Sequence, residues 1–202
     1  MKVSIIKYNA GNIRSVDYAL RRLGIEAEIT ADEKALRQSD RIIFPGVGEA
    51  SSTMEYMRRE GLDRLIPTFR QPVLGICLGM QLLCRSSEEG GAKGMNIFDT
   101  VDIRRFCPQE KTEKVPHMGW NTIQNLKGPL YKGIEEGSFV YFVHSYYAPL
   151  SPYAAATADY ILPFSASLQK GNFFATQFHP EKSGKVGERI LKNFIELSET
   201  GL

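Results

Sequence analysis

The segment at residues 73–84, VLGICLGMQLLC, decides the fold that we expect for this chain. An apolar run typical of a buried strand ends at Ile76, and a helical pattern begins after Cys77. A cysteine between Gly75 and Gly79 has the form of the G-x-S-x-G elbow, with a thiol in place of the hydroxyl. The segment therefore predicts a buried strand, a tight strained turn and a helix, with the thiol at the turn.

The rest of the first half repeats this alternation of strand and helix. We expect strands at residues 2–8, 26–30, 41–44 and 72–76, and helices at residues 13–23 and, largely, 52–69. Asn12 is expected to cap the first helix and Gly24 to end it. Strands that alternate with helices favour right-handed crossovers. The prediction is an α/β fold, a doubly wound, mostly parallel sheet flanked by helices.

After Gly90 the pattern changes to β-rich segments separated by turn residues. These segments predict additional antiparallel strands and hairpins at residues 96–106, 121–126, 138–148, 154–162 and 165–178. A last helix is expected at residues 184–197, with Ser183 as its N-cap. Because there is no linker, repeat or low-complexity tract, residues 1–202 are interpreted as a single domain.

Composition excludes several classes of function. The 25 basic and 23 acidic residues are scattered and leave a net charge of only +2, which argues against nucleic acid as a partner. No apolar run is long enough to span a bilayer or to serve as a signal sequence, so a cytoplasmic protein without a membrane partner is expected. Three cysteines without a CxxC pair argue against a disulfide framework or a zinc site.

Cys77 is the candidate nucleophile. It precedes a helix that starts at Leu78, and the amides of a helix N-terminus favour a thiolate and bind an oxyanion. Cysteine is also a common small core residue, so the elbow pattern alone leaves both interpretations open. Cys84 and Cys107 lack the glycine frame and are interpreted as core or surface residues.

A thiolate nucleophile needs a base, and His179 is the best candidate among three histidines. It follows an apolar strand, and in extended chain Glu181 lies on the same side and can hold the imidazole. A lone histidine is more often structural, but the nearby carboxylate and the elbow cysteine favour catalysis. His117 and His144 have no carboxylate at a useful spacing.

A glycine-rich segment after another expected strand supplies a third element. Residues 45–48, PGVG, offer backbone amides that can turn toward a developing negative charge. As a dinucleotide fingerprint the segment is weak, because Glu49, Ala50 and Ser51 stand where a third glycine is required.

Three motifs in this order and spacing resemble the class I, triad-type glutamine amidotransferase family: PGVG at 45–48, GICLGMQLL at 75–83 and FHPEKS at 178–183. Within the family, YNAGNIRSV at 8–16, PHMGWN at 116–121 and HPEKSG at 179–184 are similar to the glutaminase subunits of imidazole glycerol phosphate synthases, in histidine biosynthesis. The resemblance covers essentially the whole chain. It implies a flavodoxin-like fold, a Cys-His-Glu triad, and neither metal nor organic cofactor.

The resemblance also assigns roles by position. Cys77, His179 and Glu181 are the implied catalytic residues, which release ammonia from L-glutamine through a thioester. The implied oxyanion donors are the amide of Leu78 and one amide of the segment containing Gly46, Val47 and Gly48, which in the family reorients when the synthase is occupied. The implied substrate-binding groups are the backbone around Gly46 and the residues Gln81, Glu89, Ser145 and Tyr146.

The implied partner is a cyclase subunit with a (β/α)8 barrel, which forms a heterodimer with the glutaminase and receives its ammonia. The positions that match this contact are Asn12, Trp120, Tyr141 and Lys182. The alternatives keep or change the chemistry: a glutaminase subunit for pyridoxal phosphate, anthranilate or guanylate synthesis, a hydrolase or peptidase on the same elbow, or a binding module with an inert thiol.

Overall fold

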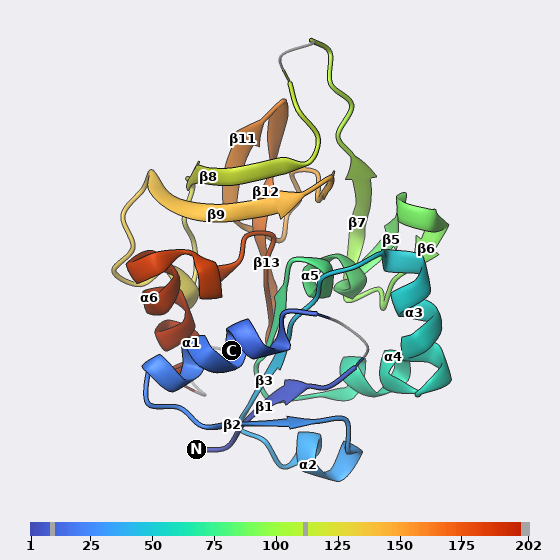
Figure 1. The fold of residues 1–202 in the computed structure, drawn as a ribbon, viewed down its shortest axis with the longest axis vertical. Coiled ribbons are helices and arrows are strands. Elements are labelled where there is room, and N and C mark those ends of the chain that lie inside the picture. The colour runs from blue at the N-terminus through green and yellow to red at the C-terminus, as the bar shows by residue number, and fades with distance from the viewer. Residues whose placement is uncertain (9–10, 111–112, 199–202) are drawn as a thin grey trace.

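A mostly parallel sheet forms the centre of the molecule (Figure 1). The structure is a computed structural model that describes residues 1–8, 11–110 and 113–198. Within these residues the main sheet has seven strands in the order β11-β12-β13-β4-β3-β1-β2. The parallel strands are β1 (Val3–Ile6), β2 (Ala27–Thr30), β3 (Arg41–Phe44), β4 (Val73–Ile76) and β13 (Phe173–Thr176). Two antiparallel strands extend one edge, β12 (Leu162–Lys170) and β11 (Ala154–Tyr160).

Helices cover both faces of this sheet because its central strands are apolar on both sides. Ile43 packs in the cluster that includes residues of α1 (Ile13–Arg22) and α6 (Gly184–Ile195). Its neighbours Ile42 and Phe44 point the other way, into the cluster with α3 (Ala50–Arg59). The same side carries two short helices, α2 (Glu33–Arg37) and α4 (Leu62–Leu65). The predicted doubly wound α/β fold is confirmed.

The second half adds two smaller sheets among the described residues. One has the order β10-β7-β5-β6, with β10 (Tyr146–Tyr147), β7 (Phe98–Arg105), β5 (Cys84–Ser87) and β6 (Ala92–Lys93). The other is an antiparallel ribbon of β8 (His117–Ile123) and β9 (Ser138–His144). The remaining elements are α5 (Leu78–Leu83), η1 (Ile66–Thr68), η2 (Glu89–Gly91), η3 (Pro129–Tyr131) and η4 (Pro180–Lys182).

Several predicted boundaries were wrong in the second half. The strand expected at 121–126 begins at His117, and the segment 165–178 holds parts of two strands joined by a turn at Gly171, whose φ is +53°. The segment 138–148 breaks at Ser145, so β9 pairs with β8 whereas β10 pairs with β7. Partner strands set these boundaries, and a single-sequence pattern does not contain them.

The helix ends also differ from expectation. Asn12 precedes α1 with a φ of +73°, and within the described residues its side chain makes no cap. Ser183 precedes α6, but its hydroxyl donates to the carbonyl of His179 at 2.6 Å instead of capping the helix. The last helix stops at Ile195, two residues early, where the buried guanidinium of Arg41 donates to the carbonyls of Phe194 and Leu197. The short helix α2 was not predicted.

In the described part of the chain, none of the helices combines the length and the apolar character that crossing a membrane demands.

Candidate active site

Cys77 occupies a strained elbow between β4 and α5. Its φ of +53° and ψ of −109° lie where an L-residue is rarely found. Its backbone N–H donates to the carbonyl of Thr176 at 2.7 Å, which ties the elbow to β13. A Cβ on Gly79 would lie 2.1 Å from the carbonyl oxygen of Phe44, so only glycine lets the helix approach β3 this closely. The predicted elbow is confirmed.

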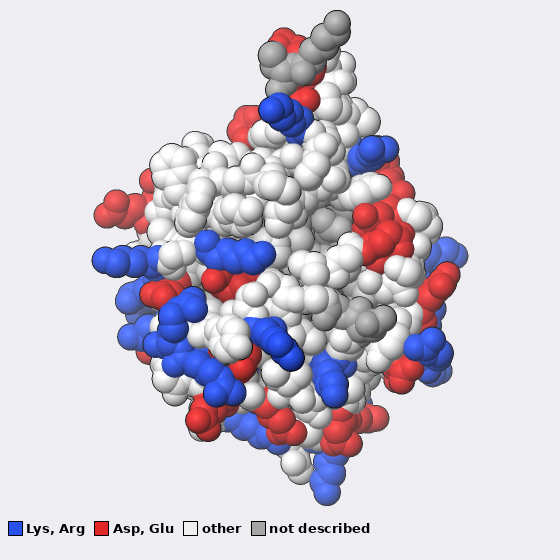
Figure 2. Space-filling model, viewed as in Figure 1, with Lys and Arg blue, Asp and Glu red and all other residues white. Residues whose placement is uncertain are grey.

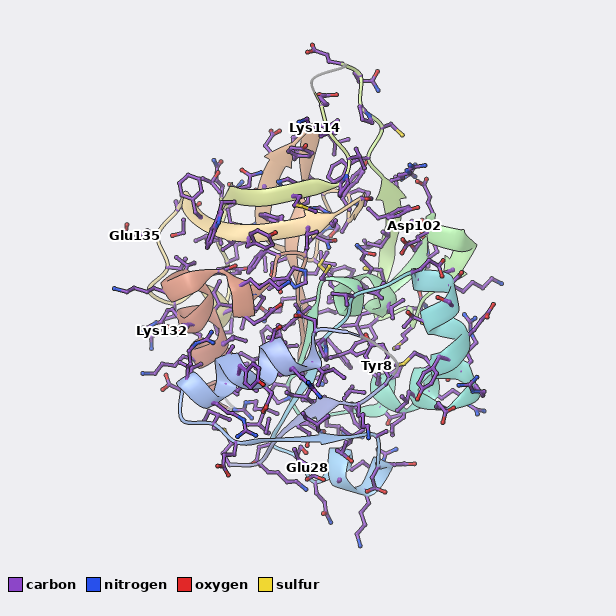
Figure 3. All side chains as sticks on the ribbon, in the orientation of Figure 1. Tyr8, Glu28, Asp102, Lys114, Lys132 and Glu135 are labelled. Atoms are coloured by element: carbon purple, nitrogen blue, oxygen red, sulfur yellow. The ribbon has the colours of Figure 1, made fainter. Side chains whose placement is uncertain are left out.

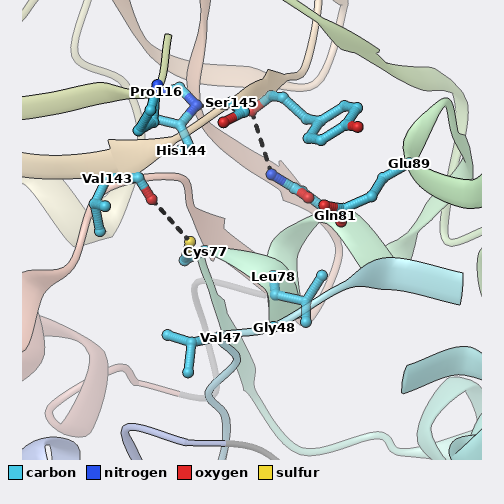
Figure 4. A pocket seen from close by; sticks show the side chains of 11 residues that line it. Val47, Gly48, Cys77, Leu78, Gln81, Glu89, Pro116, Val143, His144 and Ser145 are labelled. Atoms are coloured by element: carbon cyan, nitrogen blue, oxygen red, sulfur yellow. Dashed lines mark hydrogen bonds between the residues drawn. The ribbon is translucent and has the colours of Figure 1, made fainter. Parts of the chain in front are cut away.

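A cavity of about 330 Å³ opens above the elbow. Figure 4 shows Gln81 and Glu89 on one side of it and Pro116 and His144 on the other. The full lining is Val47, Gly48, Cys77, Leu78, Gln81, Glu89, Pro116, Val143, His144, Ser145 and Tyr146. Cys77 is only 7% exposed, and its thiol donates to the carbonyl of Val143 at 3.8 Å. The cavity has room for a small molecule of amino-acid size, and Cys77 is part of its lining.

His179 and Glu181 lie beside the elbow, because β13 is the parallel neighbour of β4 and Thr176 pairs with Ile76. The imidazole Nδ1 lies 2.7 Å from Glu181 Oε1, and both side chains are fully buried. With Glu181 as acceptor Nδ1 carries the proton, and Nε2 makes no hydrogen bond to another described residue. Two residues 102 positions apart in sequence, 77 and 179, thus follow adjacent strand ends.

Opposing effects act on the pKa of His179. Burial lowers it, but interactions with the neighbouring Cys77 and Glu181 side chains raise it by more, so the net shift is upward. The protonated form of the His179 imidazole is therefore favoured at this elbow.

Asn12 contacts this pair directly, which the sequence did not indicate. Its side-chain amide donates to Glu181 Oε1 at 2.5 Å and lies 3.4 Å from His179 Nδ1. This contact explains why Asn12 does not cap α1: its side chain holds the carboxylate that holds the imidazole. Asn9 and Ala10, in the same motif, lie outside the described residues.

Gln177 is a second residue that the sequence analysis missed. Its amide nitrogen donates to the Cys77 sulfur at 3.6 Å, and its amide oxygen accepts from Gln81 at 3.1 Å. Gln81 also donates to the carbonyl of Tyr146 at 3.3 Å. Gln177 lies two positions before His179 at the end of β13, and this alternation was the available signal.

The expected oxyanion donors do not converge in this structure. The N–H of Leu78 donates to the carbonyl of Gly46 at 3.3 Å, so it is already occupied. Because C=O and N–H point in opposite directions across a planar trans peptide, the N–H of Val47 points away from Leu78. Val47 and Gly48 line the cavity, whereas Gly46 is buried and is absent from the lining. The expectation that the backbone around Gly46 binds the substrate stays a prediction, and Val47 and Gly48 are the parts of this segment that the cavity reaches.

Glu89 presents a carboxylate at the opposite rim of the cavity. It is partly buried, and it accepts a hydrogen bond from the N–H of Ala50 at 2.8 Å. Burial raises its pKa, the bond from Ala50 lowers it, and the charge of Glu49 raises it, with a net upward shift. The Ser145–Tyr146 segment lines the same cavity. The cavity thus combines a carboxylate, an amide and backbone groups, which suits an amino-acid ligand.

The two other histidines form a neutral pair, of which His144 belongs to the cavity lining and His117 does not. His117 Nδ1 lies 3.0 Å from His144 Nε2, and His144 Nδ1 lies 2.7 Å from the carbonyl of Tyr146. Burial lowers the pKa of His117 to about 4 and that of His144 to about 3. The pKa of each is therefore lowered, whereas that of His179 is raised.

The positions matched to a partner lie on one side of this site. Trp120 on β8 is 56% exposed, and its ring meets that of Tyr141 on β9 edge-on, with centroids 6.0 Å apart. Lys182 is exposed on η4, next to the triad candidates. Asn12 is half-buried and connects this surface to Glu181.

Cys84 and Cys107 stay outside the site. Cys84 is buried, and burial raises the pKa of its thiol, followed in effect by the charge of Asp102. Cys107 is exposed.

Comparisons with known proteins agree with this geometry. The model of the glutamine amidotransferase class-I family matches residues 4–197. The chain belongs to the class-I glutamine amidotransferase family. Within it, the chain belongs with the proteins named imidazole glycerol phosphate synthase subunit HisH. The HisH subunit of Bacteroides fragilis strain YCH46 is 65% identical over 98% of this chain and 100% of its own length. The HisH subunit of Photorhabdus laumondii is 42% identical over 98% of this chain and 100% of its own length.

Solved structures with low sequence identity share the fold. A crystal structure titled glutamine amidotransferase superposes with a TM-score of 0.73 at 19% identity, covering 97% of this chain and 98% of its own. A glutamine amidotransferase from Thermotoga maritima superposes with a TM-score of 0.63 at 16% identity, covering 97% and 83%. At these identities the likeness shows the fold alone.

Proposed function

We propose that this chain is the glutaminase subunit of an imidazole glycerol phosphate synthase. It hydrolyses L-glutamine and delivers the ammonia to a cyclase subunit. The observation that carries the proposal is the Cys77 elbow at the floor of a small cavity, beside the buried His179–Glu181 pair. The 65% identity with a HisH subunit over nearly the full chain supports the choice of synthase.

The chemistry is acyl transfer. The Cys77 thiolate attacks the side-chain amide carbon of glutamine, and the carbonyl oxygen becomes an oxyanion held by backbone amides. His179 donates the proton that lets ammonia leave, and a thioester with Cys77 remains. His179 then takes a proton from water, whose oxygen attacks the thioester and releases glutamate. Glu181 holds the imidazole through Nδ1 in every step.

The cavity orients glutamine along its length. Among the described residues that line the cavity Glu89 alone has a carboxylate, and it receives the α-ammonium group. The Ser145–Tyr146 segment on the opposite wall supplies backbone groups for the α-carboxylate. Gln81 holds that segment through the Tyr146 carbonyl, and it holds Gln177 against the sulfur. The reactive amide therefore extends from Glu89 toward Cys77.

Oxyanion stabilisation requires a rearrangement of the Gly46–Val47 peptide. As long as the Gly46 carbonyl accepts from Leu78, the two amides do not face one oxyanion. Rotation of this one peptide places the Val47 N–H where the Gly46 oxygen was. Slow turnover of glutamine by the isolated chain follows, and the partner's ligand favours the rotated state.

The cyclase docks on the ribbon of β8 and β9. Over these strands Figure 2 shows white surface between basic and acidic groups, and the two strands contain no charged residue. Met118, Trp120 and Phe139 are exposed there by 63%, 56% and 58%. Large exposed apolar side chains on one face mark a protein interface. A heterodimer with a (β/α)8 cyclase in the cytoplasm accounts for this face.

Strand β9 connects the docking face to the chemistry. The carbonyl of Tyr141 accepts from the N–H of His179 at 2.9 Å, and the carbonyl of Val143 accepts from the Cys77 thiol at 3.8 Å. A shift of β9 on docking therefore reaches both the base and the nucleophile.

Glutamate release with and without a co-purified cyclase and its nucleotide ligand tests the proposal. We expect slow release by the chain alone and a strong increase with the loaded cyclase. If a synthase for anthranilate, guanylate or pyridoxal phosphate stimulated glutamate release and the cyclase did not, the cyclase would be the wrong partner and that synthase the right one. Cleavage of peptide or ester probes without glutamine hydrolysis would contradict the amidotransferase assignment.

A further inference from the structure

Tyr8 is a buried residue at the end of β1 that the mechanism above does not use. Figure 3 labels it in the layer between the sheet and the helices α3 and α4. It is 5% exposed, and its ring packs on that of Phe44 with centroids 5.4 Å apart. Its hydroxyl donates a hydrogen bond to the carbonyl of Pro45, the first residue of the PGVG segment. Tyr8 thus holds the beginning of the segment that supplies an oxyanion donor.

Gly46, the next residue, is clamped on three sides. A Cβ built on it would lie 2.7 Å from the Tyr8 hydroxyl, 2.7 Å from the N–H nitrogen of Gly79 and 2.8 Å from the Cβ of Leu78. Gly48, two residues later, is exposed, and a Cβ there would meet its nearest atom only at 3.9 Å. The segment is therefore tightly packed at residues 45–46 and has more steric room at Gly48, just before Glu49, the N-cap of α3.

We propose that Tyr8 is a positioning residue for glutamine hydrolysis: its hydroxyl fixes the Pro45 peptide, so that only the Gly46–Val47 peptide rotates when the oxyanion site forms. The proposal rests on the proposed function. With the Pro45 end fixed, rotation about ψ of Gly46 and φ of Val47 places the Val47 N–H beside the Leu78 N–H. Without the anchor, the segment shifts as a whole and the donor is misplaced.

The direction of the effect follows from which group Tyr8 binds. The Pro45 carbonyl takes no part in the rotation, so the Tyr8 bond is present before and after it. A contact that is equal in two states does not change their populations. Tyr8 therefore determines where the Val47 N–H lies in the rotated state, and it does not change the population of that state. Burial, and then the charge of Cys77, raise the pKa of Tyr8, which keeps its hydroxyl a donor at all working pH values.

The test is Tyr8→Phe, which keeps the ring and removes only the hydroxyl. In complex with the loaded cyclase, we expect kcat for glutamine to fall about 10-fold with KM unchanged, because misplacing a group by a fraction of an ångström costs about this much. Glutamate γ-semialdehyde, which forms a tetrahedral adduct with a thiolate, is expected to bind weaker by a similar factor. Alkylation of Cys77 by iodoacetamide needs no oxyanion donor and is expected to keep its rate.

Tyr131→Phe is the matched control, since it removes another buried tyrosine hydroxyl, outside the cavity lining. We expect wild-type kinetics from it. A wild-type kcat and analogue affinity for Tyr8→Phe would overturn the inference. A lower melting temperature, slower alkylation of Cys77 and a lower kcat, all in the same variant, would also overturn the inference, because together they indicate a merely structural role. If the wild-type complex itself releases no glutamate, the proposed function fails first and the inference with it.

Discussion

Two glycine-containing turns at the carboxyl ends of neighbouring parallel strands differ in how firmly they are held. The elbow after β4 is fixed by the Cys77–Thr176 backbone bond and by the contact of Gly79 with Phe44. The PGVG segment after β3 is tightly packed at Pro45 and Gly46, whereas a Cβ built on Gly48 would meet its nearest atom only at 3.9 Å. The nucleophile is thus set in place by folding, whereas in the proposed mechanism the oxyanion site forms only after the Gly46–Val47 peptide rotates. In that mechanism, rapid hydrolysis depends on a partner that favours the rotation.

Removal of the nucleophile should have the largest effect. In Cys77→Ala we expect no measurable glutamine-dependent synthase activity, because no thioester forms. Activity with free ammonia should survive, since the cyclase performs that step. Cys84→Ala is the matched control, because this buried thiol lies outside the cavity. Product formation with each nitrogen source is the measurement, and glutamine-dependent activity in Cys77→Ala would refute the role of the elbow.

Loss of the carboxylate behind the base comes next. Glu181→Gln should lower kcat about 10²–10⁴-fold, because the imidazole loses both its orientation and the charge that raises its pKa. Folded His179 has a raised pKa, so its protonation stabilises the fold below pH 6.5 and this contribution is lost as the pH rises through the folded pKa. The stability difference between wild type and Glu181→Gln should therefore shrink from pH 6 toward alkaline pH, in denaturant unfolding. A difference that grows with pH would contradict the assignment.

The close packing of the elbow is tested by stability. Gly79→Ala would place a methyl group against the Phe44 carbonyl and should lower the free energy of unfolding by about 3 kcal/mol. Gly24→Ala is the control, since Gly24 has a φ of +75° but no atom within 4 Å of a built Cβ. It should cost only about 1 kcal/mol, from backbone strain. Equal losses in the two variants would show that the elbow is not specially packed.

The smallest effect is expected at the cavity rim, at Glu89. Glu89→Gln should raise KM for glutamine about 10-fold with little change in kcat, because the charge pairing with the α-ammonium is made equally before and during reaction. The pKa of Glu89 is raised, so in wild type KM should increase as the pH falls toward and through that pKa. In Glu89→Gln this increase should be absent. A parallel pH dependence of KM in both proteins would place the α-amino subsite elsewhere.

The sequence predicted the framework of the site better than its details. Glycines around Cys77, and a carboxylate two positions after His179, are local patterns, and local patterns are what a single sequence displays. Tyr8 carried no such pattern and Gln177 only its alternation with His179, since each meets its partner through a contact between distant segments: Gln177 with Cys77, and Tyr8 with Pro45. The same reason explains the wrong prediction for Asn12. Local rules make it a helix cap, whereas in the folded chain its side chain donates a hydrogen bond to Glu181.

The sequence by itself determined the alternation of strands and helices, the strained turn at Cys77 and the imidazole–carboxylate spacing at 179–181, because each depends on neighbouring residues only. The tertiary structure decided that the Gly46 carbonyl accepts from the Leu78 N–H, which side chain holds Glu181, and that the PGVG segment is packed more tightly at Gly46 than at Gly48. These are contacts between chain segments far apart in sequence, and strand order and packing, not local preference, bring such segments together.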